Sequence, residues 1–176
     1  MSVRLVLLGL LKRKPQYGYE LKAQIEKEMG DWTSIAFGSI YFALKKLTEE
    51  GFVEQTGAEQ HGNRPSRIIY KITYSGEKEL KRLIVSLWED QSRTYFPLDI
   101  GLYFLDELDK DTQLNLVKKK RKEAGHALKY VKDHEITTIK TNQISEISKQ
   151  IFSHSICHIE AEYKWLCKLE EVIMDS

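Results

Sequence analysis

The sequence predicts a mainly α-helical fold in two parts, with a small antiparallel hairpin in the first part. Apolar residues recur at helical spacing through most of the 176 residues, and β-branched and aromatic residues gather instead near 52–56 and 68–72. The charge also divides the chain. Up to residue 85 there are 14 Lys and Arg against 10 Asp and Glu, and the remainder has 13 against 16. We therefore expect one domain at 1–85 and a second at 86–176.

Three short helices are expected in the first fifty residues. The first, Val3 to Lys12, is apolar on nearly all sides and ends before Pro15, which cannot continue a helix. The second runs from Gly18 to Gly30 and has one apolar stripe. The third spans Ser39 to Glu50 and ends at Gly51. Its apolar positions, expected to face the core, are Ile40, Ala43, Leu44 and Leu47.

A hairpin of two strands, 52–56 and 68–72, follows the third helix. Its long polar connection contains glycine and proline, and it carries Arg64 close to Arg67. Three helices followed by a two-stranded wing is the order of the winged helix-turn-helix. In that fold the third helix lies in the major groove of DNA, and the hairpin reaches the backbone or the minor groove.

The remainder is expected to be an all-α dimerisation domain with long helices. A helix with apolar residues from Leu80 to Trp88 leads out of the first domain, and the chain then breaks near Pro97. A short helix from Asp99 to Leu108 and a long one from Asp111 to about Thr138 follow. A near-heptad apolar seam over 144–173 predicts a last long helix that needs a partner. The partner is the preceding helix, the same helix of a second subunit, or both.

The exposed arc of the third helix holds candidate DNA contacts. Tyr41 and Lys45 are four residues apart and are therefore neighbours, and both can bond phosphate oxygens. Ser39, near the helix start, can reach a base edge or a phosphate. In the hairpin, Arg64 and Arg67 suit phosphate or minor-groove contact. The alternative is a solvated helix face with one tyrosine packed on the wing, and arginines that are merely exposed or face across the hairpin.

Three phrases in the first eighty residues resemble the PadR family of bacterial transcriptional regulators. They are the second-helix phrase Tyr17-Gly18-Tyr19-Glu20-Leu21, the third-helix phrase from Gly38 to Leu47, and Tyr70-Lys71-Ile72-Thr73 running into Gly76. The C-terminal helices, including Glu162-Tyr163-Lys164-Trp165-Leu166, look like the larger subgroup with a multi-helix dimerisation domain. Phe42 departs from the family, in which proline is common at that position, and this changes the groove-facing surface while leaving the fold intact.

The resemblance implies a homodimeric repressor that binds double-stranded DNA and is released by a small molecule or other signal. It also implies that Tyr19, Ser39, Tyr41 and Lys45 contact the DNA. Because a two-fold dimer presents two third helices, the operator is expected to be an inverted repeat. A winged-helix module that binds another protein, and not DNA, is the alternative, because a fold does not determine its partner.

Aromatic residues gather around the break between the two parts, and they suggest an effector site. The candidates are Trp88, Tyr95 and Phe96, which could receive a small aromatic effector at the junction. The plainer interpretation is a core where the linking helix meets the second domain. An effector bound there would have to favour one spacing of the DNA-binding domains.

Other function classes find no support in the sequence. It contains no nucleophile elbow, glycine-rich phosphate loop or metalloprotease histidine pair, so we expect no enzyme and no cofactor. His154, His158 and Glu162 share one helical face, but one face supplies too few ligands for a tetrahedral site, and we expect no metal. Cys157 and Cys167 lie too far apart on a helix for a disulfide. With no signal peptide or membrane span in view, we expect a cytoplasmic protein without a membrane partner.

Overall fold

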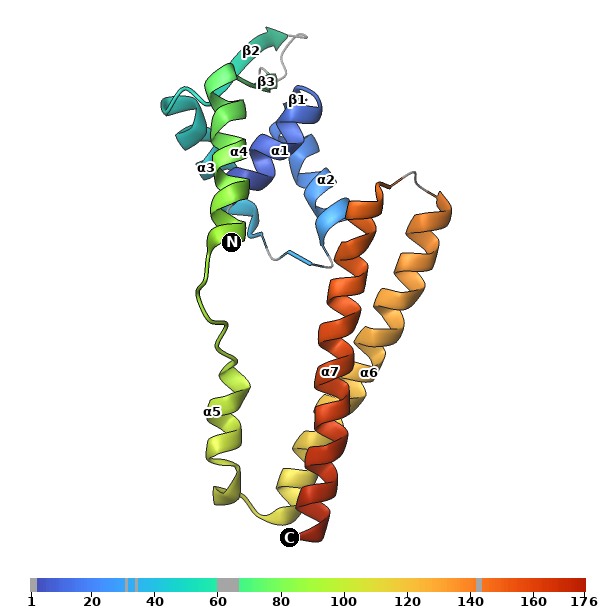
Figure 1. Cartoon of the computed structure of the whole chain (residues 1–176). Helices are drawn as coiled ribbons and strands as arrows, with labels where there is room; N and C mark the ends of the chain where they lie inside the picture. The colour runs from blue at the N-terminus through green and yellow to red at the C-terminus, as the bar shows by residue number, and fades with distance from the viewer. Residues whose placement is uncertain (1–2, 31, 34, 60–66, 142–143) are drawn as a thin grey trace. The chain divides into compact units, whose positions relative to one another are not determined.

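The computed structural model describes residues 3–30, 32–33, 35–59, 67–141 and 144–176, which form two compact units, Met1–Ser92 and Arg93–Ser176 (Figure 1). The first unit holds the predicted helices and wing. In chain order its elements are α1 (Val3–Arg13), β1 (Gln16–Tyr17), α2 (Gly18–Met29), α3 (Phe37–Glu49), β2 (Val53–Glu59), β3 (Arg67–Ile72) and α4 (Tyr74–Glu89). The units divide after α4, and this helix continues through residue 85, the predicted domain boundary.

The wing strands belong to a three-stranded antiparallel sheet in the order β1-β3-β2. The strand β1 was not predicted, because two residues are too short to show an alternating pattern. Tyr17 of β1 pairs with Ile69, and Val53 of β2 pairs with Ile72. This pairing attaches the segment between α1 and α2 to the wing. The start of α2 is thereby held beside β3.

The first unit has a core of its own, built where α1, α2 and α3 meet the sheet. The apolar face predicted for α3 is buried, and α1 is buried along most of its length. The buried members of this core are Val6, Leu7, Leu8, Leu10, Leu11, Leu21, Ile25, Ile40, Ala43, Leu44, Leu47 and Val53. From α4, Leu80 and Leu83 pack against it.

Two glycines let α3, the wing and α4 meet closely. Gly51 takes a φ of +76°, which ends α3 and turns the chain into β2. Its carbonyl accepts hydrogen bonds from the hydroxyls of Thr73 and Ser75, at 2.8 and 2.9 Å. In the first turn of α4, a Cβ on Gly76 would lie 2.1 Å from the carbonyl oxygen of Phe52. Only glycine allows this approach, which explains the residue in the phrase that begins at Tyr70.

The second unit consists of α5 (Pro97–Tyr103), a 3₁₀ turn η1 (Leu105–Glu107), α6 (Lys110–Thr141) and α7 (Glu146–Asp175). The single helix predicted from Asp99 to Leu108 is therefore wrong in detail, because the chain leaves helical geometry at Phe104, whose φ is −107° and ψ is 13°. Both long helices are capped at their start. The Asp109 carboxylate accepts the Thr112 N–H, and the Ser145 hydroxyl accepts the Ser148 N–H.

The partner of the apolar seam on α7 is, within one chain, the preceding helix α6 (Figure 1). Val117, Leu166 and Ile173 form their small buried core. Gly125 of α6 makes room for the ring of Tyr163, which lies 3.3 Å from the position of an added Cβ. Arg121 pairs with Glu170 at 3.2 Å along the same contact.

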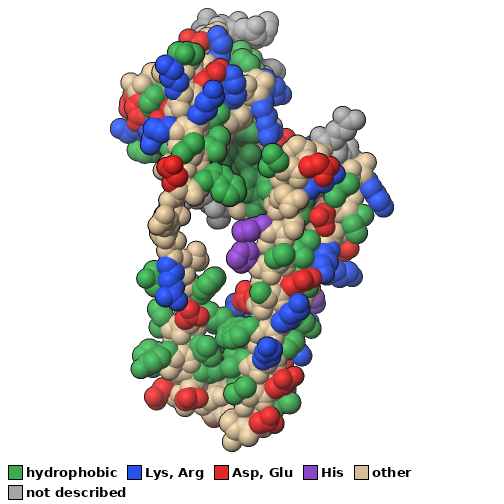
Figure 2. Space-filling view, in the orientation of Figure 1, with side chains coloured by type: hydrophobic (Ala, Val, Ile, Leu, Met, Phe, Trp, Pro, Cys, Tyr) green, Lys and Arg blue, Asp and Glu red, His purple; other side chains and the backbone are tan. Residues whose placement is uncertain are grey.

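Much of the apolar surface of the second unit stays exposed, and Figure 2 shows hydrophobic side chains on its surface. Its exposed large apolar residues include Tyr95, Phe96, Ile100, Tyr103, Phe104, Leu108, Leu116, Ile147 and Val172. Over the described residues, none of the helices combines the length and apolar character that crossing a lipid bilayer requires.

Candidate nucleic-acid interface

The helix α3 presents the predicted contact face to solvent. Its inner residues are buried in the core, and Tyr41, Phe42 and Lys45 are exposed on the opposite side. Phe42 has an exposed fraction of 64%, and the ammonium of Lys46 lies 6.0 Å from the centre of its ring. An exposed helix with two lysines and two aromatic rings can offer charge and flat apolar surface to the same partner.

Tyr41 does not extend freely from α3, because its ring lies over the start of α2. A Cβ on Gly18 would be 2.8 Å from Cε1 of Tyr41, so the glycine provides the space that the ring occupies. Burial, and then the nearby Tyr41, raise the pKa of Tyr70 above its usual value. The ring of Tyr41 thus packs on the start of α2 and keeps an exposed side.

Tyr19 lies in the first turn of α2 and is exposed, and its ring stacks on that of Tyr17 with centroids 5.5 Å apart. The Glu20 carboxylate accepts the backbone N–H of Tyr17 at 3.0 Å, which stabilises the start of the helix. The phrase from Tyr17 to Glu20 thus builds an aromatic and capped helix start beside α3.

Ser39 contacts the residue that precedes α3, and Lys45 contacts a residue within the helix. The Ser39 hydroxyl donates to the carbonyl of Ala36, which leaves its oxygen able to accept a hydrogen bond. The Lys45 ammonium lies 3.9 Å from the Glu49 carboxylate, and Glu49 also pairs with Lys46 at 3.6 Å. Exposed ion pairs of this kind contribute less than about 1 kcal/mol to the free energy of unfolding. A phosphate can therefore displace the Glu49 carboxylate at little cost.

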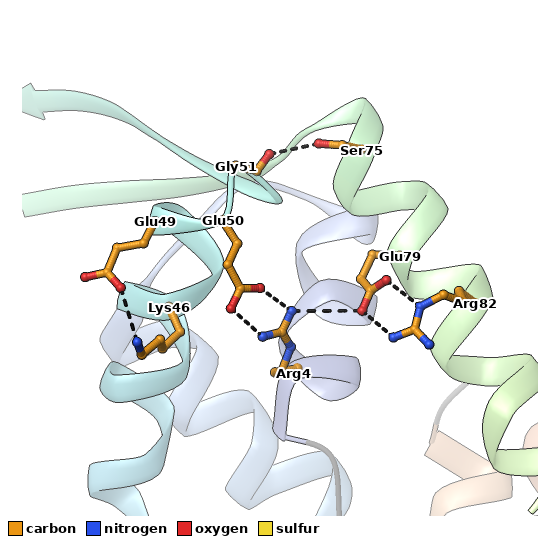
Figure 3. A network of polar contacts seen from close by, with 8 residues as sticks. All are labelled: Arg4, Lys46, Glu49, Glu50, Gly51, Ser75, Glu79 and Arg82. Atoms are coloured by element: carbon orange, nitrogen blue, oxygen red, sulfur yellow. Dashed lines mark hydrogen bonds and ion pairs between the residues drawn. The ribbon is translucent and has the colours of Figure 1, made fainter.

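A polar network that was not predicted from the sequence holds the end of α3 against α1 and α4 (Figure 3). The guanidinium of Arg4 donates two hydrogen bonds to the Glu50 carboxylate, one of them 2.9 Å long, and lies 3.9 Å from Glu79. Hydrogen bonding by Arg4 lowers the pKa of Glu50. Arg82 bonds Glu79 and, with a smaller contribution from Arg4, lowers its pKa. Arg4 and Glu50 are 46 positions apart, so the sequence carries no local signal of this pair.

The two predicted wing arginines are described only in part. Arg64 lies outside the described residues, and Arg67 is described for its backbone, which pairs with Glu59 at the end of the hairpin. Closer to the base of the wing, Lys71 faces Glu54 on the neighbouring strand, and their charged groups lie 3.0 Å apart. The charge of this lysine is thus partly satisfied within the sheet.

The predicted effector residues are exposed. Trp88, near the end of α4, has an exposed fraction of 87%, and Tyr95 and Phe96 lie in the second unit before α5. The guanidinium of Arg93 lies 5.6 Å from the ring centre of Tyr95. A cavity of about 410 Å³ lies in the second unit, and none of the three predicted effector residues lines it. It is lined by Leu98, Gly101, Leu102, Leu105, Leu108, Leu116, Val117, Lys119, Lys120, Glu123, Trp165, Leu166 and Leu169.

Three helices followed by a two-stranded wing, with one face of α3 exposed, define a winged helix-turn-helix fold. Residues 7–82 match the family described as "Transcriptional regulator PadR-like family". This similarity covers less than half of the chain, and residues 7–82 are its PadR-like domain.

Individual relatives agree with this assignment. Over 78 residues the chain is 35% identical to "Negative transcriptional regulator PadR" of Bacillus subtilis, a match that covers 44% of this chain and 42% of that protein. The match therefore spans less than half of the relative's length. Two solved structures of Bacillus subtilis PadR share the fold, each with a TM-score of 0.80. One, in complex with operator DNA, is 21% identical and matches 97% of this chain and 98% of its own. The other, with p-coumaric acid, is 19% identical and matches 99% and 96%.

Proposed function

We propose that this chain is a homodimeric repressor that binds double-stranded DNA through α3 and the wing. The observation that carries the proposal is the exposed face of α3, where Tyr41 and Lys45 lie on a helix seated in a closed core. The PadR-like domain supports it, as does the relative solved with operator DNA. Repression is proposed because the Bacillus subtilis relative is described as a negative regulator.

In the proposed complex α3 enters the major groove. Lys45 and the Tyr41 hydroxyl bond phosphates, and Ser39 uses its acceptor oxygen at a base edge or a phosphate. Tyr19 contacts the backbone from the adjacent start of α2. Arg64 and Arg67 extend the contact from the wing to phosphates or the minor groove. Residues 1–85 are thus the proposed DNA-binding domain.

The proposed dimer forms through residues 86–176. Ile100, Tyr103 and Phe104 expose their apolar side chains on and beside α5, and a second copy would cover them. A two-fold dimer would place two α3 helices on successive major-groove faces. We therefore expect an inverted-repeat operator with half-sites about one helical turn apart.

Release by a small aromatic effector at Trp88, Tyr95 and Phe96 is the remaining part of the proposal. Their exposed rings could stack on a flat ligand, and the guanidinium beside Tyr95 could neutralise an acidic group on it. The relative solved with p-coumaric acid supports a ligand of this type. Such a ligand would act only if it binds one spacing of the two DNA-binding domains more tightly than another.

The second candidate function is a winged-helix module that binds a protein. The exposed ring of Phe42 on α3 favours it, because aromatic residues are enriched in protein interfaces. Salt dependence distinguishes the two candidates. Binding to DNA phosphates releases counterions and weakens steeply with salt, whereas binding to a protein need not.

The experiment is to select bound duplexes from a random pool and to measure affinity for the selected site by fluorescence anisotropy at several salt concentrations. Replacing both Lys45 and Arg64 by alanine should weaken binding to all duplexes. It should also flatten the salt slope by up to about one unit for each phosphate that the variant no longer neutralises. Lys129→Ala, which removes an exposed lysine from α6, is the matched control. Unchanged affinity and slope in the double variant would contradict the proposed DNA surface.

A further inference from the structure

Two histidine rings on α7 converge on one point. His154 and His158 are one helical turn apart, both exposed, and their Nε2 atoms lie 3.2 Å from each other. The ring centres are 4.5 Å apart, with the planes at 65°. Without a ligand between them, one imidazole N–H can donate to the other nitrogen. Both rings thus direct the nitrogen farther from the backbone to the same place.

The separation of the two nitrogens matches the span of two ligands on one metal ion. Imidazole nitrogens bind Zn²⁺ at about 2.0–2.1 Å. With an ion at that distance from both Nε2 atoms, the nitrogen–metal–nitrogen angle is roughly 100°. This value lies between the ideal square-planar and tetrahedral angles. The rings would therefore need little movement to bind an ion. The helix places residues i and i+4 on one face, and the rotamers of the two rings set the separation of their nitrogens.

Against the expectation of no metal drawn from the sequence, we propose that His154 and His158 form a two-histidine site for a divalent late transition metal ion of the class of Ni²⁺, Cu²⁺ and Zn²⁺. Imidazole suits these ions, whereas Mg²⁺ and Ca²⁺ prefer oxygen ligands. Among the described residues no group of three or more metal-ligating side chains occurs, so water fills the remaining positions of the ion. The site lies on α7 and does not depend on the proposed DNA binding.

Glu162, the next residue on this face, is engaged elsewhere. Its carboxylate lies 3.4 Å from the ammonium of Lys120 on α6. The two histidines therefore carry the site by themselves. A bound ion would link two successive turns of α7 and stabilise that part of the helix, because it binds the folded arrangement in preference to the unfolded chain.

The test is calorimetric titration of the full-length protein with NiCl₂ in a buffer that does not bind metals. We expect one Ni²⁺ per chain, and a loss of affinity of at least tenfold in His154→Ala and in His158→Ala. His126→Ala removes an exposed histidine of α6 and is the matched control, with an expected change below twofold. Circular dichroism of each variant shows whether α7 remains helical.

A second readout uses thermal unfolding with and without NiCl₂. Saturating metal should raise the melting temperature of the wild-type protein and of His126→Ala, and leave His154→Ala/His158→Ala unchanged. The proposal is overturned if the double variant binds Ni²⁺ with wild-type affinity, or if His126→Ala loses as much affinity as the single variants on α7. Loss of metal binding with intact operator affinity would separate this site from the DNA surface.

Discussion

The two units of the chain bury their apolar residues to very different extents. In the first, α1, α2 and α3 close a continuous core under the small sheet. In the second, two helices of about thirty residues bury a few side chains between them, and α5 exposes Ile100 and Tyr103. A compact arrangement of short helices can complete its core from one chain. A pair of long helices has another side that remains uncovered.

This difference supports the second unit as the place of the proposed dimer contact. The first unit has the internal packing to hold α3 in position by itself. The second leaves large apolar side chains exposed, which supports the proposal that the dimer contact lies there. Substitutions in the core of one unit and on the surface of the other can test this contrast.

The largest expected effect comes from Leu44→Ala in the core of the first unit. Leu44 is fully buried, so the variant loses transfer free energy and leaves a cavity, at a cost of about 2–5 kcal/mol in the free energy of unfolding. Ile100→Ala, with an exposed fraction of 67%, should cost less than about 0.5 kcal/mol in the monomer. Urea unfolding followed by circular dichroism measures both. Equal losses would remove the contrast between the units.

The second effect comes from Gly76→Ala, at the contact of α4 with the turn before β2. The added Cβ would overlap the carbonyl oxygen of Phe52, and we expect a loss of about 1–3 kcal/mol. Gly38→Ala is the matched control, because a Cβ there meets nothing within 4 Å and alanine favours a helix. The control should keep or slightly raise stability in the same unfolding experiment. If Gly76→Ala left the free energy of unfolding unchanged, α4 would be able to shift on the sheet at little cost.

The third effect concerns the exposed face of α5. Ile100→Glu places a charge on the surface proposed to contact a second copy, and it should raise the dissociation constant of the dimer at least tenfold, or about 1.4 kcal/mol. Sedimentation equilibrium measures this constant. Ile68→Glu is the matched control. It changes an exposed isoleucine of β3 in the first unit and should leave the dissociation constant of the dimer unchanged. If Ile100→Glu left the dissociation constant of the dimer unchanged, the contact would lie on another face.

The smallest effect is the acid dependence of the network around Arg4. Because the folded pKa values of Glu50 and Glu79 are lowered, their stabilisation is fully present above the unfolded value of about 4.3 and is lost as pH falls through the folded pKa. Arg4→Gln should therefore be less stable than wild type at neutral pH, with a difference that shrinks in acid. Urea unfolding across pH measures it. A difference that grows on acidification would contradict this role.

The helical elements could be predicted because their signals are local. The apolar spacing of α3 placed Tyr41 and Lys45 on its exposed face, and the structure confirms that placement. Whether they contact DNA stays a prediction. The strand β1 and the break at Phe104 were missed, because two residues show no period and a short helix ends without a proline or glycine to mark it.

The sequence by itself determined the order of the elements, the buried face of each helix in the first unit and the resemblance to PadR-like regulators. Only the tertiary structure decided which distant residues meet. Tyr41 lies over Gly18, Gly76 approaches Phe52, and Arg4 reaches Glu50. The physical reason is that periodicity records which side of an element is apolar, whereas these contacts depend on how separate elements are oriented once they pack. The same holds for the two imidazole rings on α7, whose spacing is local but whose convergence depends on their rotamers.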